Sequence, residues 1–181
     1  MVSISDDLPK TVIFALKLNL MKKLLILFLA FTLNSCNDGD FDVPGFEFTE
    51  TVNKCGAYVL YITNTNSTEV FVLTLPSTAL GTSPTVTLPI STTVMATYRI
   101  FDKSIGTTYF CQDVPPLEPK ILKELKADEI GTINIVSTEI LTNGAITGYS
   151  YEITILKLLL KDGNDRIYEE SFNFGTLKIM N

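Results

Sequence analysis

Side chains that alternate with a period of two are the feature that most constrains this chain. The alternation dominates after residue 45, where no convincing helical period is found. Successive residues of a strand face opposite sides of a sheet, so this period predicts β-strands. Residues 58–63 and 70–75 form the clearest pair, and the polar run at 64–68 between them predicts a hairpin with a longer loop.

Turn residues divide the rest of the chain into further expected strands, at 85–90, 93–101, 107–111, 132–141, 146–160 and 167–174. Pro89 places the first of these at a sheet edge, because proline has no N–H for an inner ladder. The turn at 102–106 predicts a second hairpin that joins 93–101 to 107–111. Asn143 and Gly144 predict a tight turn. Residues 120–126 fit two helical turns or a strand, and their β surroundings favour a strand.

The segment at 146–160 changes the phase of its apolar side chains between Ile155 and Leu156, which indicates a β-bulge. With the other segments it makes about eight to ten strands separated by frequent turns. The chain is therefore predicted to be all-β. We expect one antiparallel two-layer β-sandwich, rather than a barrel, as a single domain at 48–181.

A short apolar segment precedes this domain. Lys22 and Lys23 come before ten largely apolar residues at 24–33, too few for a bilayer span of about 20 but suited to a signal peptide. The next residues, Leu33-Asn34-Ser35-Cys36, resemble the lipobox of bacterial lipoproteins, although Asn34 departs from the usual small residue. The resemblance implies that a signal peptide at 21–35 is cleaved and that Cys36 receives acyl chains, which anchor it in a lipid bilayer.

The residues on either side of the apolar segment have different expected roles. Residues 1–20 contain Asp6 and Asp7, which suit a signal peptide poorly, so we expect Met21 to be the true start and 1–20 an extension of the start site. Residues 36–47 are expected to be a flexible acidic tether. The acidic stretch just after Cys36 also resembles a signal that directs lipoproteins of the Bacteroidetes group to the cell surface. The expected location is the cell envelope, anchored to the outer membrane on its periplasmic or cell-surface face.

Composition excludes several classes of function. The chain has no His, which removes Ser-His-Asp and Cys-His catalysis and every His-containing metal site. Loss of residues 1–35 would leave 10 basic (14 − 4) and 18 acidic (20 − 2) residues, a net charge of −8, which disfavours nucleic acid as a partner. The turn at 162–165 fails the EF-hand pattern, because position twelve is Asn173. We expect no metal and no cofactor.

With Cys36 lipidated, Cys55 and Cys111 remain as an even pair in an oxidising compartment, and we expect a disulfide rather than two separate buried thiols. A second, weaker resemblance is to uncharacterised Bacteroidetes lipoproteins. It is carried by these residues in order: Cys55, 58–62, 98–101, 109–111, 115–116, 131–133 and 172–175. The resemblance implies the paired cysteines and a β-sandwich, and it brings no activity.

Two functions are open to such a chain. The first is a non-enzymatic module that binds a protein or glycan partner or serves the envelope structurally. The alternative is a carboxylate-dependent glycoside hydrolase of the envelope, which needs two acidic side chains in one cleft. The candidates for that pair are Glu69, Asp102, Asp113, Glu118, Glu139 and Glu152. Glu118, Glu124, Asp128 and Glu129 lie in a loop-rich stretch and are expected on the solvated surface. The aromatic residues of the strands are expected in the core or in cross-strand packing.

Overall fold

The computed structural model describes residues 47–56, 59–112, 114 and 116–181. The predicted extension at 1–20, the signal peptide at 21–35, Cys36 and the tether up to residue 46 lie outside these residues. The described residues form nine strands and one 3₁₀ turn. They are β1 (Asn53–Cys55), β2 (Val59–Thr63), β3 (Glu69–Thr74), β4 (Thr85–Pro89), β5 (Met95–Phe101), η1 (Tyr109–Cys111), β6 (Ile121–Ala127), β7 (Thr132–Thr142), β8 (Ala145–Asp162) and β9 (Asp165–Met180).

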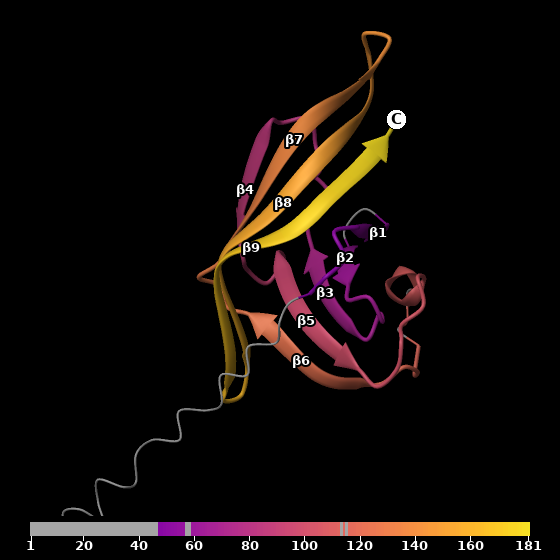
Figure 1. Cartoon of the computed structure of the whole chain (residues 1–181). Coiled ribbons are helices and arrows are strands. Elements are labelled where there is room, and N and C mark those ends of the chain that lie inside the picture. The colour runs from indigo at the N-terminus through magenta and orange to yellow at the C-terminus, as the bar shows by residue number, and fades with distance from the viewer. Residues whose placement is uncertain (1–46, 57–58, 113, 115) are drawn as a thin grey trace, which may run out of the picture. The chain divides into compact units, whose positions relative to one another are not determined.

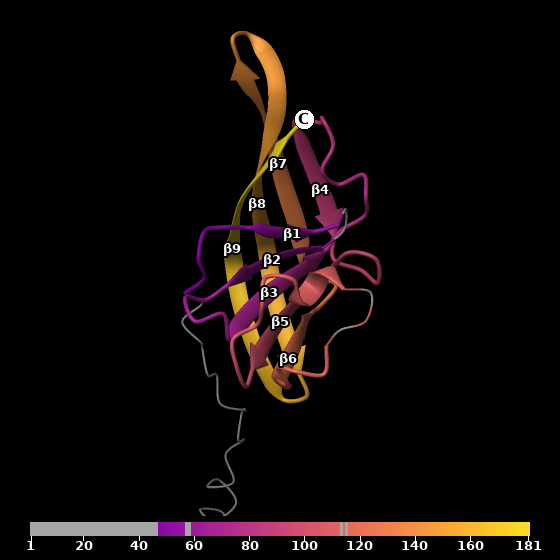
Figure 2. The same cartoon turned by 90° about the vertical axis from the view of Figure 1, so that its right-hand side faces the viewer.

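The strands form one continuous antiparallel sheet that folds back on itself. The order is β1-β2-β3-β5-β6-β8-β7-β4, and β9 pairs with β8 outside this path. The sheet bends so that β1, β2, β3, β5 and β6 form one layer and β4, β7, β8 and β9 cross it as the other (Figures 1 and 2). The all-β, antiparallel, two-layer prediction is confirmed, including β4 at an edge and 120–126 as the strand β6.

The eighteen-residue strand β8 turns the corner between the two layers. Its first part pairs with β7 as far as Leu156, and its last part pairs with β6 at Leu160 and Lys161. Between these parts Lys157 has a positive φ of 53°, and Ile155 and Leu158 on either side of it are both fully buried. The predicted change of phase is therefore confirmed at this corner. A separate register shift between β8 and β9 follows Ile153.

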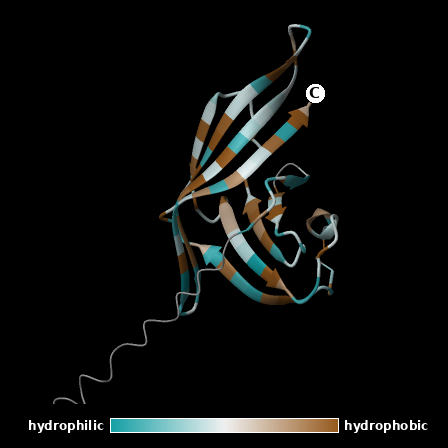
Figure 3. Cartoon of the chain, in the orientation of Figure 1, coloured by the Kyte–Doolittle hydropathy of each residue, from teal (hydrophilic) through white to brown (hydrophobic). Residues whose placement is uncertain are grey.

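The core lies between the layers. Figure 3 shows hydrophobic and hydrophilic residues alternating along the strands, as the period of two requires. Phe71 of β3 is fully buried; its ring stacks on Phe172 at 4.9 Å between centroids and meets Phe174 edge-on at 6.0 Å. The predicted core role of the strand aromatics is confirmed for the buried Tyr61, Tyr98, Tyr109, Tyr151, Phe172 and Phe174.

Residues 47–52, named here the N-terminal strap, close one side of the sandwich. Phe48 makes edge-on contacts with Phe71, Tyr98 and Phe172, and the backbone of Thr49 donates to Thr63 O at 2.8 Å. The strap also crosses β9, where a Cβ on Gly175 would lie 3.0 Å from Glu50 O. Gly175 has a φ of 123°, so both the close approach and the backbone conformation require glycine.

The prediction of a second hairpin from 93–101 to 107–111 is wrong. Residues 109–111 form the 3₁₀ turn η1, and β5 pairs with β6 instead. The reason is that Tyr109 and Phe110, whose rings meet edge-on, pack over the outer face of the first layer. There the ring of Tyr109 contacts Phe101, and the ring of Phe110 contacts Tyr61. Burial of these rings fixes the segment over the face of the sheet rather than at its edge.

The disulfide between Cys55 and Cys111 is confirmed, with the two Cα atoms 4.9 Å apart. It joins β1 to η1 beside a small second cluster of buried residues on the outer face of the first layer. The cluster consists of Cys55, Tyr61, Val70, Val72, Phe101, Ile105 and Tyr109. The cross-link therefore holds the segment after β5 down on this face.

Candidate functional site: a groove on the outer face of the first layer

The groove that we call the outer groove lies beside the small cluster and has a volume of about 520 Å³. Its floor consists of cross-strand neighbours of β3, β5 and β6, which share one face because directly paired residues project to the same side. Val72 pairs with Thr97, which pairs with Lys126, and Arg99 pairs with Glu124. The lining is Val59, Val72, Thr74, Ile90, Ser91, Thr92, Met95, Ala96, Thr97, Arg99, Phe110, Glu124, Lys126, Ala127 and Glu129.

Three charged side chains meet on the floor of the outer groove. Arg99 Nε donates to Glu124 Oε2 at 2.6 Å, and Lys126 Nζ lies 3.3 Å from Glu124 Oε1. Arg99 and Glu124 are both about three-quarters buried. One carboxylate is thus held between two cations, which fixes its position and leaves a net positive charge on the trio.

The two cations also decide the protonation state of Glu124. Partial burial acts to raise its pKa, but the hydrogen bond and charge of Arg99, together with those of Lys126, outweigh burial and bring the pKa below its ordinary value. A glycosidase acid needs a raised pKa in order to hold its proton near neutral pH. Glu124 is therefore an ionised anchor for Arg99 and Lys126 rather than a proton donor.

An apolar wall stands next to these charges. Phe110 from η1 borders the outer groove, and the Arg99 guanidinium carbon lies 5.9 Å from the centre of its ring, within cation–π range. Met95, Val72 and Val59 add apolar surface along the floor. A groove with an apolar wall and a fixed set of hydrogen-bonding charges can hold and orient a ligand that has both kinds of surface.

Glu124→Gln should lower the free energy of unfolding by roughly 1 kcal/mol near neutral pH, since it removes a largely buried carboxylate from two cations. Because the pKa of Glu124 is lowered in the fold, this stabilisation is present above the pKa of the unfolded carboxyl. It is lost as the pH falls through the folded pKa, so wild type and variant should converge in acid. Urea unfolding across pH measures the difference.

Glu129→Gln is the matched control, because Glu129 lines the same groove and takes part in no ion pair among the described residues. It should leave the free energy of unfolding within about 0.5 kcal/mol of wild type. An equal loss in both variants, or a Glu124→Gln loss that grows toward acid, would contradict the assignment of Glu124 as an ionised anchor.

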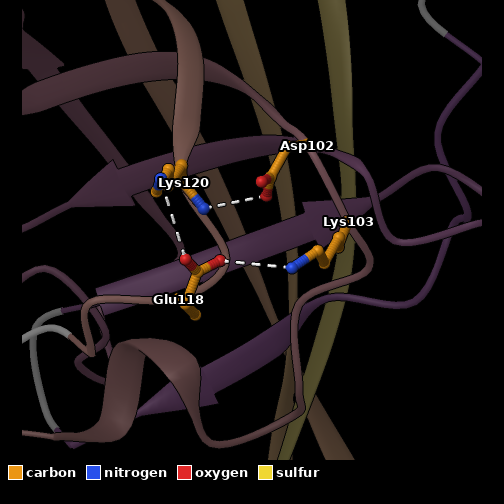
Figure 4. Close-up of polar contacts among 4 residues, drawn as sticks. All are labelled: Asp102, Lys103, Glu118 and Lys120. Atoms are coloured by element: carbon orange, nitrogen blue, oxygen red, sulfur yellow. Dashed lines mark hydrogen bonds and ion pairs between the residues drawn. The ribbon is translucent and has the colours of Figure 1, made fainter.

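The acidic residues singled out from the sequence lie elsewhere. Glu69 accepts from the Tyr98 hydroxyl at 2.6 Å. Asp102 and Glu118 converge around Lys120 (Figure 4): Asp102 accepts its backbone N–H at 2.9 Å, and Glu118 lies 4.0 Å from its Nζ. Glu139 lies on β7 and Glu152 on β8, while Asp113 is outside the described residues. The five described members of the set line neither the outer groove nor the open cleft between β6 and the β8–β9 turn.

Sequence reasoning missed the trio in the outer groove. The prediction that Glu124 lies on the solvated surface is wrong, because Glu124 is on β6 and only 28% of its side chain is exposed. Glu124 and Lys126 are two residues apart, and that spacing on a strand would have placed them on one face. Arg99 could not be joined to them, because the pairing of β5 with β6 follows from the overall topology.

Other kinds of site find no support in the described part of the chain. Within it, no group of three or more His, Cys, Asp or Glu side chains is placed to hold a metal ion. None of its helices is long and apolar enough to cross a membrane. Comparison with models of protein families, with curated proteins and with solved structures finds no match to this chain.

Proposed function

We propose that this chain is a bacterial lipoprotein of the cell envelope, anchored through acylated Cys36, whose β-sandwich binds a protein or glycan partner without catalysis. The resemblance of Leu33-Asn34-Ser35-Cys36 to a lipobox motivates the anchor. The resemblance to uncharacterised Bacteroidetes lipoproteins and the acidic stretch after Cys36 favour the outer membrane, on either its periplasmic or its cell-surface face.

The disulfide between Cys55 and Cys111 is the observation that carries this proposal. It pairs two of the three cysteines of the chain and leaves Cys36 as the one outside the cross-link. Disulfides persist in oxidising compartments such as the periplasm and the cell surface and are rare in the cytosol. The fold thus supports export independently of the signal-peptide pattern, and lipidation of Cys36 gives the third cysteine a role.

The outer groove is where we place the partner. The disulfide and the rings of η1 hold one wall of this groove against the sheet, so the site is largely formed before binding. A preformed site loses little conformational freedom when it binds, which favours affinity. Arg99 and Lys126 offer donors to the acceptor groups of a glycan or peptide, and Phe110 offers an apolar ring face.

Cys36→Ala tests the anchor. The wild-type protein, expressed in a Gram-negative host, should sediment with membranes. Its mass should exceed that of the unmodified chain beginning at Cys36 by the mass of the attached acyl chains. The variant should lack that mass and should not follow the membrane in detergent extraction. Asp42→Asn, a change within the tether, is the control and should behave as wild type. A wild-type chain that stays soluble with residues 1–35 attached would refute the lipoprotein proposal.

A further inference from the structure

Three apolar side chains stand exposed at one end of the sandwich. Leu117 is 94% exposed, Leu122 68% and Ile121 43%. They lie within six residues of one another in the sequence, at the start of β6 and in the loop before it. Ile121 and Leu122 are consecutive on the strand and project to opposite faces of this end of the sheet. We name these three residues the end patch. A single exposed leucine or isoleucine is ordinary, but several grouped at one end of a domain mark a candidate docking surface.

The end patch lies at the same end of the first layer as the N-terminal strap. A chain of backbone hydrogen bonds connects them across neighbouring strands: Thr49 donates to Thr63 O, Phe101 to Thr68 O, and Asp102 to Lys120 O. Residue 120 immediately precedes the patch residues of β6. The tight turn between β7 and β8 lies at the other end of the sandwich (Figures 1 and 2).

We infer that the end patch docks on the lipid bilayer that carries the anchor, with Leu117 and Leu122 entering the interfacial region. This inference rests on the proposed lipidation of Cys36. Residues 37–46 then join the lipid to the strap, and ten residues span at most about 35 Å when fully extended. The patch is therefore held at high effective concentration near the membrane, where even weak apolar contact is populated.

The charges around the end patch indicate that the contact is apolar. Glu118 is shared between Lys103 at 3.4 Å and Lys120 at 4.0 Å (Figure 4), and Lys123 pairs with Asp165 at 2.7 Å. Two lysines share the one carboxylate of Glu118, so these pairs leave about one net positive charge beside the patch, fewer than the four to eight basic residues of a segment that binds anionic headgroups. Docking should therefore occur on zwitterionic lipid and depend little on salt, unlike binding through a polybasic segment.

A tryptophan introduced into the end patch tests the inference, because the chain contains no Trp and each variant then carries a single reporter. Leu117→Trp replaces an exposed side chain and is expected to fold. Leu141→Trp is the matched control: Leu141 is 58% exposed and lies on β7 next to the turn at the far end. The lipidated full-length product of each variant is reconstituted in phosphatidylcholine vesicles whose acyl chains are brominated near the headgroup.

In the Leu117→Trp protein the tryptophan emission maximum should shift to the blue. The emission intensity should be about twofold lower in brominated than in unbrominated vesicles, because an interfacial side chain lies about 5–10 Å deep, within reach of the bromines. The Leu141→Trp protein should show neither change. Three results would overturn apolar docking of this end. Both variants could be quenched, neither could be quenched, or quenching could require added anionic phosphatidylglycerol.

Intact mass separates this inference from the lipoprotein proposal. If the acyl mass is present and the Leu117→Trp protein is not quenched, the anchor stands and the docking is wrong. If the acyl mass is absent, the lipoprotein proposal fails. The same two variants are then coupled through the thiol of Cys36 to a maleimide lipid in the same vesicles, which is selective because Cys55 and Cys111 are cross-linked. Quenching of the Leu117→Trp protein alone would still support docking there, and its absence would overturn it.

Discussion

Phe71→Ala should lower the free energy of unfolding by about 4 kcal/mol, the largest loss expected from a single core substitution in this protein. Phe71 lies at the centre of β3, fully buried between the layers, and its ring contacts Phe48, Phe172 and Phe174. Truncation removes the apolar surface of a whole ring. It also leaves a cavity that rigid strands on both sides cannot close.

Urea unfolding followed by circular dichroism measures this loss, since the chain has no Trp to report it. Phe71→Leu is the control, because it keeps most of the volume and should cost less than half as much, about 1.5 kcal/mol. A typical domain has only about 5–15 kcal/mol to lose, so the alanine variant should be close to unfolding at moderate urea. Equal losses for the two variants would show that the ring contacts do not determine stability here.

Opening the disulfide should also cost about 4 kcal/mol, because Cys55 and Cys111 are 56 residues apart and the cross-link restricts a long loop of the unfolded chain. The effect acts mainly through the unfolded state, so a Cys55→Ala/Cys111→Ala variant should keep its β-type circular dichroism spectrum in buffer. Its unfolding midpoint in urea should nevertheless be much lower than that of the oxidised wild type.

The reduced wild type is the matched comparison, since it differs from the oxidised protein only in the cross-link. Reduced wild type and the double alanine variant should unfold at similar urea concentrations. If reduction leaves the midpoint of the wild type unchanged, the contribution of the loop has been overestimated. The urea midpoint of the reduced wild type could instead fall far below that of the alanine variant. That result would mean that the free thiols disturb the small cluster around Cys55.

Local signals determined much of the fold in advance. Alternation located the strands, and Asn143-Gly144 located the turn between β7 and β8, where both residues have positive φ. These features depend on neighbours in sequence. The pairing of β5 with β6, the crossing of the N-terminal strap over Gly175 and the meeting of Arg99 with Glu124 depend on residues far apart in sequence. No local pattern specifies such a pairing.

The same distinction explains the mistaken hairpin at 107–111. Tyr109 and Phe110 have the composition of a strand, and the turn before them favoured one. What decided their conformation was a buried surface for their rings, provided by Tyr61 and Phe101 from two other strands, and the cross-link at Cys111. The outer groove was missed for a related reason, because η1 forms one of its walls.

Strand β8 belongs to both layers, since it pairs with β7 before Lys157 and with β6 after it, while β9 accompanies it on the other side. The two layers therefore cannot separate along this side without breaking the pairing of β8. They share one cooperative transition instead of melting as separate units. For a protein exported as proposed above, such a transition keeps half-folded forms rare, and with them the exposed sheet faces that neighbouring chains bind and proteases cleave.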